Sequence, residues 1–512
     1  MDITQTLDDW LKEAEFAENI AYRQLTPPRQ ALFEPFPATI HPALKRTLNA
    51  KGITALYSHQ AKAISLLESG ENIVISTGTS SGKSLCYGIP IINQQLNQPG
   101  ATSLLLFPTK ALTNDQYNNF ADYAEQLPGG NIKPAIYDGD TPNHQRSAMR
   151  KSATILMTNP DMLHQGILPH HTSWARFFSN LRFVVIDEMH IYRGVFGSHF
   201  ANLMRRLKRI CAFYNAYPQF VLTSATIGNP EELAASLIEQ KVHLIDEDGS
   251  PKGPAHFMVY NPPLVDEKLG IRKSSIDFGV TFAQKLTHAN HQSLVFARTR
   301  RTVEMLLTYL RHRLPIQEQN AVRGYRSGYL KSERREIEQG LKSGSVRAVF
   351  STSALELGVD IGDLDAVILV GFPGTIATAR QRIGRAGRKQ QPSLGIMIAT
   401  NEAMDQYLAA HPEYLVDRNP EQALIDPQNL VILLQHIGCA AFELPFSRSE
   451  GFGSMNPEEL ARFLDLLEQS GSLTRQGEEY YWLADRYPAA EVSLRSSTPN
   501  VVSLNVVEEN NE

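Results

Sequence analysis

Cysteine is scarce in this sequence, and long apolar runs are missing from it. The three cysteines, Cys86, Cys211 and Cys439, lie far apart, and none has a close cysteine neighbour. This spacing supports neither a disulfide framework nor a four-cysteine zinc site. No apolar run approaches the roughly 20 residues of a membrane span, and the acidic, polar start MDITQTLDDW does not resemble a signal peptide. We therefore expect a protein of the reducing cytoplasm.

A surplus of basic charge is also absent. The formal net charge is −5 and the isoelectric point is near 6.3. A polyanionic partner must therefore be held by a local basic cleft, because the overall field would not attract it. The hydrophobic fraction of 42% and the charged fraction of 20% are ordinary for a globular protein. The length of the chain predicts about three domains.

The stretch ENIVISTGTSSGKSL, residues 71–85, has the pattern of a phosphate-binding loop. An apolar run predicts a buried strand, small residues follow it, and a further apolar stretch predicts a helix. Backbone N–H groups of such a loop surround a phosphate, Lys83 would contact the β- and γ-phosphates, and Ser84 would bind Mg²⁺. Thr77 stands where the common pattern has its first glycine, and taken alone the stretch also fits a Ser/Gly turn. The residues expected to bind the nucleotide are Thr77, Gly78, Thr79, Ser80, Ser81, Gly82, Lys83 and Ser84.

Polar residues follow each of the short apolar runs between residues 103 and 222. Such alternation of apolar runs with helical segments predicts a parallel sheet, in which ligand groups gather at the carboxyl ends of the strands. In DEMH, Asp187 is expected to hold Mg²⁺, and Glu188 to orient and deprotonate water. DE alone also fits a solvated strand end, but the phosphate loop upstream favours the catalytic interpretation. His190 could link the nucleotide site to TSAT, and Gln60 could read the edge of adenine.

A second block of strands and helices runs from about residue 290 to 400 and contains no phosphate loop. In its segment QRIGRAGR, residues 381–388, Arg382, Arg385 and Arg388 follow at intervals of three and lie near one helix face. Arginines with glycine spacers suit close approach to a phosphate chain. A basic, solvated helix face is the alternative.

The ordered series of motifs between residues 55 and 400 resembles the superfamily 2 helicases of the DEAD/DEAH-box type. The series is HQ, TGTSSGKS, PTKAL, TNPD, DEMH, TSAT, VFARTRR, STSALELGVDIG and QRIGRAGR. The stretches IYRGVFGSHFANLMRRL, RGYRSGYLKSERREIE and RYPAAEVSLRS are similar to the bacterial MrfA/YprA-type DNA-repair helicases and their fungal RecQ-like relatives. The resemblance implies an α/β fold of two tandem RecA-like parallel-sheet domains and ATP-driven, 3′-to-5′ movement on single-stranded or tailed DNA.

The resemblance also assigns roles to individual residues. Gln60 would contact adenine, Asp360 would meet the ribose, and Gln381, Arg385 and Arg388 would reach the γ-phosphate from the second domain, completing a catalytic set with Lys83, Asp187 and Glu188. Ser224 and Thr226 would couple hydrolysis to movement, together with His190. The residues expected to face nucleic acid are Thr109, Lys110, Asn159, Arg298 and Thr352. The implied cofactors are ATP and Mg²⁺, and a repair nuclease is an unidentified partner.

We expect the chain to divide into five parts. These are an N-terminal extension (1–40), an ATP-binding domain (41–245), a linker (246–270), a helicase C-terminal domain (271–415) and an accessory domain (416–512). In the last, NPEELARFLDLLEQSG predicts a helix with an Asn456–Glu459 capping box, and LTRQGEEYYWL predicts a hairpin turning at Gly477. These elements suggest a winged helix, with a plain helical packing domain as the alternative. The implied relatives usually continue into a four-cysteine module that this sequence lacks, so we expect either a truncated form or part of a longer protein.

Two other functions are compatible with the same motifs. An RNA helicase would share the ATP site, and only a preference for one nucleic acid would distinguish it. A nucleotide-switched binding module would bind ATP with negligible turnover, but the presence of Lys83, Glu188 and Arg385 favours hydrolysis.

Overall fold

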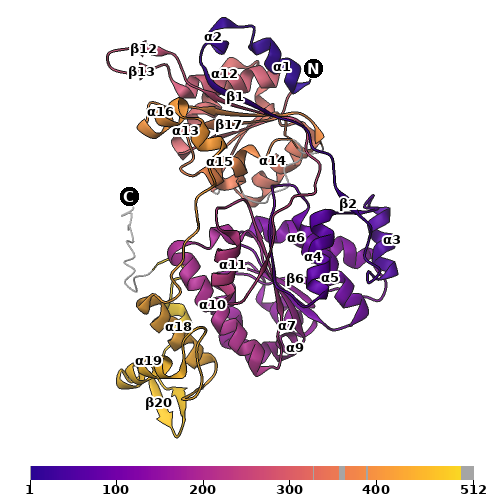
Figure 1. The fold of residues 1–512 in the computed structure, drawn as a ribbon, viewed down its shortest axis with the longest axis vertical. Coiled ribbons are helices and arrows are strands. Elements are labelled where there is room, and N and C mark those ends of the chain that lie inside the picture. The colour runs from indigo at the N-terminus through magenta and orange to yellow at the C-terminus, as the bar shows by residue number, and fades with distance from the viewer. Residues whose placement is uncertain (1, 327, 357–363, 388–389, 497–512) are drawn as a thin grey trace, which may run out of the picture.

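The computed structural model describes residues 2–326, 328–356, 364–387 and 390–496. Two seven-stranded sheets form separate domains, and a small C-terminal domain lies beside the first of them (Figure 1). The α/β fold class predicted from the sequence is therefore confirmed.

The sheet of the first domain is parallel throughout and has the strand order β10-β4-β9-β8-β5-β7-β6. Its strands are β4 (Ile73–Ser76), β5 (Thr102–Leu106), β6 (Pro134–Ile136), β7 (Ile155–Thr158), β8 (Leu181–Ile186), β9 (Gln219–Ser224) and β10 (His243–Ile245). Alternate residues of β4 enter opposite apolar clusters, Val74 one and Ile73 and Ile75 the other. Because helices cover both faces, the strands are apolar without alternation.

The helices of the first domain follow its strands in the expected alternation. They are α3 (Pro42–Ala50), α4 (Ser58–Glu68), α5 (Lys83–Asn97), α6 (Lys110–Gln126), α7 (Asn143–Ser152), α8 (Pro160–Met162), α9 (Ala175–Ser179), α10 (Gly194–Phe213) and α11 (Pro230–Ile238). A small two-stranded sheet pairs β2 (Phe33–Glu34) with β3 (Leu56–Tyr57). Each strand that carries a motif thus ends at the same edge of the sheet.

The second sheet has the order β1-β11-β18-β17-β14-β16-β15 and is parallel except for β1. Its strands are β1 (Ile20–Thr26), β11 (Ala255–Tyr260), β14 (Ser293–Ala297), β15 (Val322–Tyr325), β16 (Ala348–Ser351), β17 (Ala366–Val370) and β18 (Ser393–Ile398). Its helices are α12 (Ser275–His288), α13 (Arg300–Arg313), α14 (Lys331–Ser343), α15 (Ile376–Ile383), α16 (Ala403–Ala410) and α17 (Glu413–Val416), and the hairpin of β12 (Leu264–Asp266) and β13 (Ile271–Arg272) projects from it.

The chain segments that precede and follow the first domain both contribute a strand to the second sheet. The sequence did not reveal this arrangement. The N-terminal segment supplies β1 as well as α1 (Ile3–Trp10) and α2 (Ala14–Ala17), and Trp10 packs in the second core, stacked on Phe282. The stretch 246–270, expected to be a linker, contains β11, which is hydrogen-bonded between β1 and β18. The apolar residues of 255–260 fit a buried strand, but the Pro and Gly residues around them favoured a loop.

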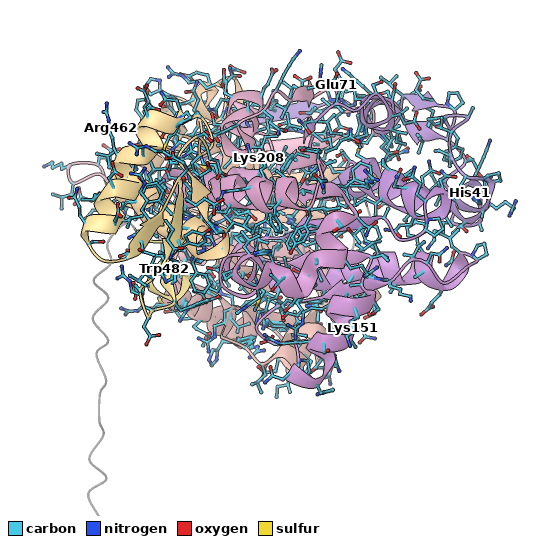
Figure 2. The ribbon with its side chains drawn as sticks, turned by 90° about the horizontal axis from the view of Figure 1, so that it is seen from below. His41, Glu71, Lys151, Lys208, Arg462 and Trp482 are labelled. Atoms are coloured by element: carbon cyan, nitrogen blue, oxygen red, sulfur yellow. The ribbon has the colours of Figure 1, made fainter. Side chains whose placement is uncertain are left out.

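The C-terminal domain consists of α18 (Leu430–Glu443), α19 (Pro457–Gln469) and α20 (Pro488–Glu491) with a three-stranded antiparallel sheet of β19 (Phe446–Ser447), β20 (Leu473–Gln476) and β21 (Glu479–Trp482). Asn456 and Glu459 form the predicted capping box, and Gly477 turns the hairpin with φ +65°. Figure 2 shows Lys208 of α10 between this domain, marked by Arg462 and Trp482, and the distant His41 of the first domain.

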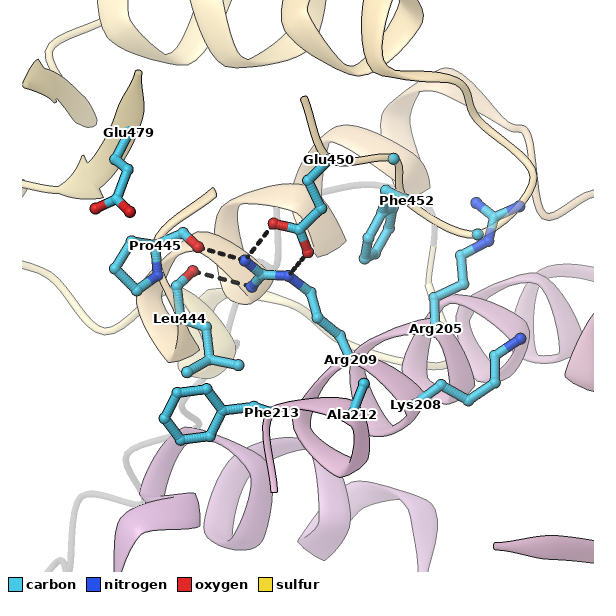
Figure 3. Close-up of a pocket in the computed structure, with 12 residues that line it drawn as sticks. Arg205, Lys208, Arg209, Ala212, Phe213, Leu444, Pro445, Glu450, Phe452 and Glu479 are labelled. Atoms are coloured by element: carbon cyan, nitrogen blue, oxygen red, sulfur yellow. Dashed lines mark hydrogen bonds and ion pairs between the residues drawn. The ribbon is translucent and has the colours of Figure 1, made fainter. Parts of the chain in front are cut away.

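Basic residues of α10 form much of the contact with the C-terminal domain (Figure 3). Arg209 donates to Glu450 at 2.6 Å and to the carbonyls of Ala440 and Leu444 at 2.9 Å. Arg205 forms an ion pair with Glu239 at 2.6 Å. A cavity of about 680 Å³ lies at this contact. Both arginines that line this cavity are therefore already paired with carboxylates, Arg205 within the first domain and Arg209 across to the C-terminal domain.

Candidate nucleotide site between the two sheet domains

The loop between β4 and α5 has the backbone of a phosphate cradle. Gly82 has φ +80°, and a Cβ there would lie 2.6 Å from Nε2 of Gln60, so glycine is required twice over. Ser80 is also left-handed, with φ +60°. The Thr77 hydroxyl lies 2.7 Å from that of Ser81, and this bond closes the loop at the position where the common pattern has a glycine.

Side chains around the loop hold it in place. The Lys83 ammonium donates to the carbonyls of Thr77 and Gly78, both at 2.9 Å, and so lies over the loop. The Gln60 amide donates to the Gly82 carbonyl at 3.1 Å and accepts from the Tyr57 N–H at 3.0 Å. With both amide groups engaged inside the protein, the expected adenine contact of Gln60 stays a prediction.

The two acidic residues after β8 lie in contrasting surroundings. Asp187 is buried and accepts hydrogen bonds from the Thr223 hydroxyl and, at 3.2 Å, from the Glu188 N–H. Burial and the neighbouring Glu188 charge raise the pKa of Asp187 to about 7, although the Thr223 hydroxyl and Lys83 oppose the change. Glu188 has the uncommon left-handed φ of +51°, which turns its side chain out of the direction of the strand.

Ser84 and Asp187 provide the hard oxygen donors that Mg²⁺ prefers. The hydroxyl of Tyr87 lies beside Ser84 and is affected by the charges of Asp187 and Glu188, so these groups share one small region. Among the described residues, no group of three or more His, Cys, Asp or Glu side chains forms a metal cage. Two protein donors suit Mg²⁺ that is also bound by phosphates and water.

The residues expected to couple hydrolysis to movement follow the acidic pair and the neighbouring strand β9. The His190 Nδ1 accepts from the Ala225 N–H at 3.2 Å and lies 3.4 Å from the Glu188 carboxylate, so it joins DEMH to TSAT. Burial lowers the pKa of His190 to about 4, and Lys83 acts in the same direction. Ser224 is buried, whereas Thr226 is exposed.

The second domain contributes α15 and the turn that follows it. Arg382 donates to the Glu356 carboxylate at 3.1 and 2.8 Å and stacks over Phe296. Arg385 is buried and donates to the Glu356 carbonyl at 2.6 Å. Glu356 therefore orders both arginines, and the two N–H groups of Arg382 share one oxygen of its carboxylate. Asp360 and Arg388 lie outside the described residues.

The two halves of the site meet directly. The Thr79 hydroxyl of the phosphate loop donates to the carbonyl of Gly384 at 2.6 Å, one residue before Arg385. The buried polar atoms that have no hydrogen-bond partner among the described residues include Oε2 of Glu188, Nε2 of His190 and Nε2 of Gln381. Buried polar atoms without partners are costly unless a ligand satisfies them. A nucleotide with its metal and attacking water fits this set.

The five residues expected at nucleic acid lie at the carboxyl ends of neighbouring strands. Thr109 and Lys110 follow β5 and Asn159 follows β7, its partner, while Arg298 follows β14 and Thr352 follows β16, its partner. Thr109 and Asn159 also cap helices α6 and α8. Lys110 is paired with Asp140 at 2.9 Å, and Arg298 with Glu402. Both basic residues are thus exposed and held by carboxylates that a phosphate would have to replace.

Four further residues belong to the site and were not singled out from the sequence. Thr223 and Glu356 have been described. The Lys252 ammonium lies 3.0 Å from Asp248 and only 2.9 Å from where a Gly78 Cβ would be. The exposed ring of Phe33 stacks on Tyr57, 5.4 Å between centroids, near Gln60. Lys252 and Phe33 come from chain segments without a local motif, so only the fold brings them here.

Two tandem parallel-sheet domains with a phosphate loop on one and buried arginines on the other define a nucleoside-triphosphate site of the RecA-like kind. Comparison with known proteins places it further. Residues 57–233 match the DEAD/DEAH box helicase family, residues 279–390 the helicase conserved C-terminal domain, and residues 425–497 the winged helix domain of ATP-dependent helicase HRQ1. The chain belongs to the DEAD/DEAH-box helicases, as the motif series indicated, and its C-terminal domain is a winged helix.

Relatives cover nearly the whole chain. The uncharacterized ATP-dependent helicase YprA of Bacillus subtilis is 45% identical over 97% of this chain and 66% of its own length. ATP-dependent helicase HRQ1 of Saccharomyces cerevisiae is 40% identical over 85% of this chain and 42% of its own. The crystal structure of the DUF1998 helicase MrfA bound to DNA has a TM-score of 0.92 at 45% identity, covering 97% of this chain and 65% of that one.

The chain thus spans about two thirds of YprA and less than half of HRQ1. Within the described residues, no helix has both the length and the apolar character needed to cross a bilayer.

Proposed function

We propose that this chain is an ATP-dependent DNA helicase or translocase that moves on single-stranded DNA, and that it serves DNA repair. The observation that carries the proposal is the contact between Thr79 and Gly384, which places buried Arg385 beside the phosphate loop. Closure of the two sheet domains around ATP and their opening after hydrolysis would shift the strand-end residues of the two domains relative to each other.

The proposal assigns a residue to each step of hydrolysis. Lys83 and the loop N–H groups would hold the phosphates, and Ser84 and Asp187 would hold Mg²⁺, which supplies charge neutralisation when bound. Glu188 would take the proton of the attacking water, and Arg385 would stabilise the charge that develops on the γ-phosphate. Gln381, whose amide nitrogen is buried and has no hydrogen-bond partner among the described residues, would bind the same phosphate.

DNA is favoured over RNA by the relatives. MrfA has been crystallised bound to DNA, and also bound to DNA and AMPPNP, at 45% identity to this chain. Movement in the 3′-to-5′ direction, a cytoplasmic location and a nuclease partner remain predictions.

The test is ATP turnover with single-stranded DNA and with RNA of matched length and sequence. We expect stimulation by DNA, loss of turnover without Mg²⁺, and a decrease of about 100-fold or more in Lys83→Ala, because a phosphate-binding charge is removed. Stronger stimulation by RNA would indicate an RNA helicase. Turnover that Glu188→Gln leaves unchanged would show that the assigned chemistry is wrong, and negligible wild-type turnover would indicate a nucleotide-switched binding module.

Direction is tested separately with tailed duplexes. We expect unwinding of a duplex with a 3′ single-stranded tail, and no unwinding of one with a 5′ tail. The reverse result would contradict the predicted polarity without affecting the ATPase assignment.

A further inference from the structure

The segment 417–429, here called the interdomain strap, joins α17 of the second domain to α18 of the winged helix and contacts both sheet domains on its way. It has no helix or strand of its own. A connection between domains needs only to be long enough, and most such connections run over the surface. This one instead makes a series of hydrogen bonds with functional segments of the helicase core.

The first domain holds the strap at the loop that follows TSAT. The Gly228 N–H, two residues after Thr226, donates to the Glu421 carbonyl at 3.2 Å. Asn229 forms a reciprocal pair with the backbone of Ala423, donating at 3.1 Å and accepting at 2.8 Å. A Cβ on Gly228 would lie 2.5 Å from the Pro420 carbonyl, so the strap lies directly on this loop.

The second domain holds the strap at the start of α15. The two oxygens of the Glu421 carboxylate accept from the Ile376 N–H at 2.6 Å and the Ala377 N–H at 3.1 Å. The first N–H groups of a helix have no partner within it, and a negative charge there is favoured by the helix dipole. At the other side of this helix, Arg380 donates to three carbonyls of residues 415, 416 and 418.

Glu421 is therefore a single residue bonded to both halves of the nucleotide site. Its carbonyl is bonded to the loop after the coupling motif TSAT, and its carboxylate to the helix that leads into Gly384 and Arg385. From these contacts we propose that Glu421 is a positioning residue that transmits movement of the TSAT loop to the arginine helix. The inference rests on the proposed function, because it concerns the arginines that complete the ATP site.

The physical requirement is a charged acceptor with two oxygens. Thr375, the residue before α15, uses its hydroxyl to accept from the Thr378 N–H at 3.1 Å, so it does not serve Ile376 or Ala377. A glutamine at 421 would keep the length of the side chain, but its amide NH₂ would face a helix N–H and the charge would be lost. The carbonyl bond to Gly228 would remain, so only the link to the second domain would be cut.

The experiment compares Glu421→Gln with Glu413→Gln as a matched control. Glu413 lies in α17 of the same region, is exposed, and pairs with His411 at 3.2 Å. We measure turnover with single-stranded DNA, the KM for ATP, and the affinity for a fluorescent non-hydrolysable ATP analogue with and without DNA. In Glu421→Gln we expect the DNA-stimulated kcat to fall about tenfold, whereas the KM for ATP measured without DNA should stay close to the wild-type value.

The decisive readout is the factor by which DNA changes affinity for the ATP analogue. It should fall towards one in Glu421→Gln and stay at the wild-type value in Glu413→Gln, whereas a merely structural defect would weaken both affinities together. Asn229→Ala removes the two hydrogen bonds to the backbone of Ala423 on the first-domain side and provides a second test. If both residues act through the strap, the double variant should be no worse than the more impaired single variant.

The outcomes separate the two proposals. Wild-type turnover that DNA does not stimulate contradicts the proposed function. The role of Glu421 can then still be tested by comparing the basal turnover of Glu421→Gln with that of the wild type, because the same arginines complete the ATP site. Stimulated wild-type turnover with a Glu421→Gln variant that keeps its kcat and its DNA-dependent affinity change overturns only the role of Glu421.

Discussion

The first sheet domain has two interfaces of opposite construction, one with the winged helix and one with the second sheet domain. Towards the winged helix, Arg206 of α10 and Glu443 of α18 form an ion pair whose side chains are 0% and 1% exposed. Four buried histidines surround this pair: His164, His171, His199 and His436. Towards the second sheet domain, the described contacts include the bond from Thr79 to Gly384, the packing of Ala111 against the second core, and the strap.

His436 and His199, beside Arg206, form a continuous chain of hydrogen bonds. Arg206 donates to Nδ1 of His436 at 3.3 Å, His436 donates to Nδ1 of His199 at 3.0 Å, and His199 donates to the Ser496 carbonyl at 3.0 Å. Each ring therefore uses one donor and one acceptor, as a neutral imidazole does. A buried, fully bonded network keeps one geometry, since breaking it leaves unpaired charge in a dry interior.

The two interfaces predict which domains move together. The winged helix is joined to the first domain as tightly as parts of one core, and so we expect it to move with that domain during ATP turnover. The interface between the sheet domains instead contains buried polar atoms that have no hydrogen-bond partner among the described residues, and we expect it to open during turnover. The stretch after DEMH, whose arginines lie on α10, is accordingly a docking helix for the winged helix.

The largest expected effect is on kcat and concerns the interface between the two sheet domains, here called the open interface. Arg385→Ala should lower kcat by about 1,000-fold, because an arginine that stabilises the transferring phosphate is lost. The melting temperature should stay close to that of the wild type, since the domain cores are untouched. Steady-state turnover and thermal unfolding measure the two quantities, with the half-exposed Arg313 of α13 mutated to alanine as control. If Arg385→Ala lowers the melting temperature as well as kcat, the two interfaces do not differ in the expected way.

Substitutions in the contact between α10 and the winged helix, here called the tight interface, should lower stability. Glu443→Ala should lower the free energy of unfolding by about 3–5 kcal/mol, because Arg206 would be left charged and buried. The exposed pair of Arg298 and Glu402 is the control, and Glu402→Ala should change stability by less than about 1 kcal/mol. Urea unfolding at neutral pH measures both. If the two variants lose equal stability, the buried network is not the stronger contact.

Acid should weaken the tight interface first. Burial lowers the pKa of His164 to about 2 and that of His436 well below its usual value, and it also lowers the pKa of His199. The unfolded chain therefore binds protons below pH 6.5 that the folded protein does not, so stability falls as the pH falls. For a histidine that stays neutral when folded, the loss at pH 5 is about 2 kcal/mol. Urea midpoints between pH 7 and 5 test this, and a flat profile would contradict it.

The smallest of these effects concerns Glu356, which orders the arginines within the open interface. Glu356→Gln should lower kcat about tenfold, because Arg382 loses a charged partner while Arg385 keeps its bond to the backbone carbonyl. Turnover and the KM for ATP distinguish this from a binding defect. An effect as large as that of Arg385→Ala would assign Glu356 a direct part in the chemistry.

Motifs with a local cause could be predicted from the sequence. The phosphate loop needs small residues between a strand and a helix, and the Asn456–Glu459 cap depends on residues three apart, so both are visible in a short window. Phe33, Lys252 and Glu356 are in the site for a different reason, because distant strand ends bring them there. Asp187 and Glu188 were identified by type, but the pKa of Asp187 follows from burial that no local pattern encodes.

The family, the two sheets and the residue types at the nucleotide site could be predicted from the sequence, because each depends on local periodicity or on motifs in a defined order, whereas the winged helix was one of two alternatives. Only the tertiary structure decided that the N-terminal segment completes the second sheet, that α10 binds the winged helix through a buried ion pair, and that Glu421 contacts both halves of the site. Those features join residues hundreds of positions apart, and their energies come from burial and hydrogen-bond geometry that exist only in the folded chain.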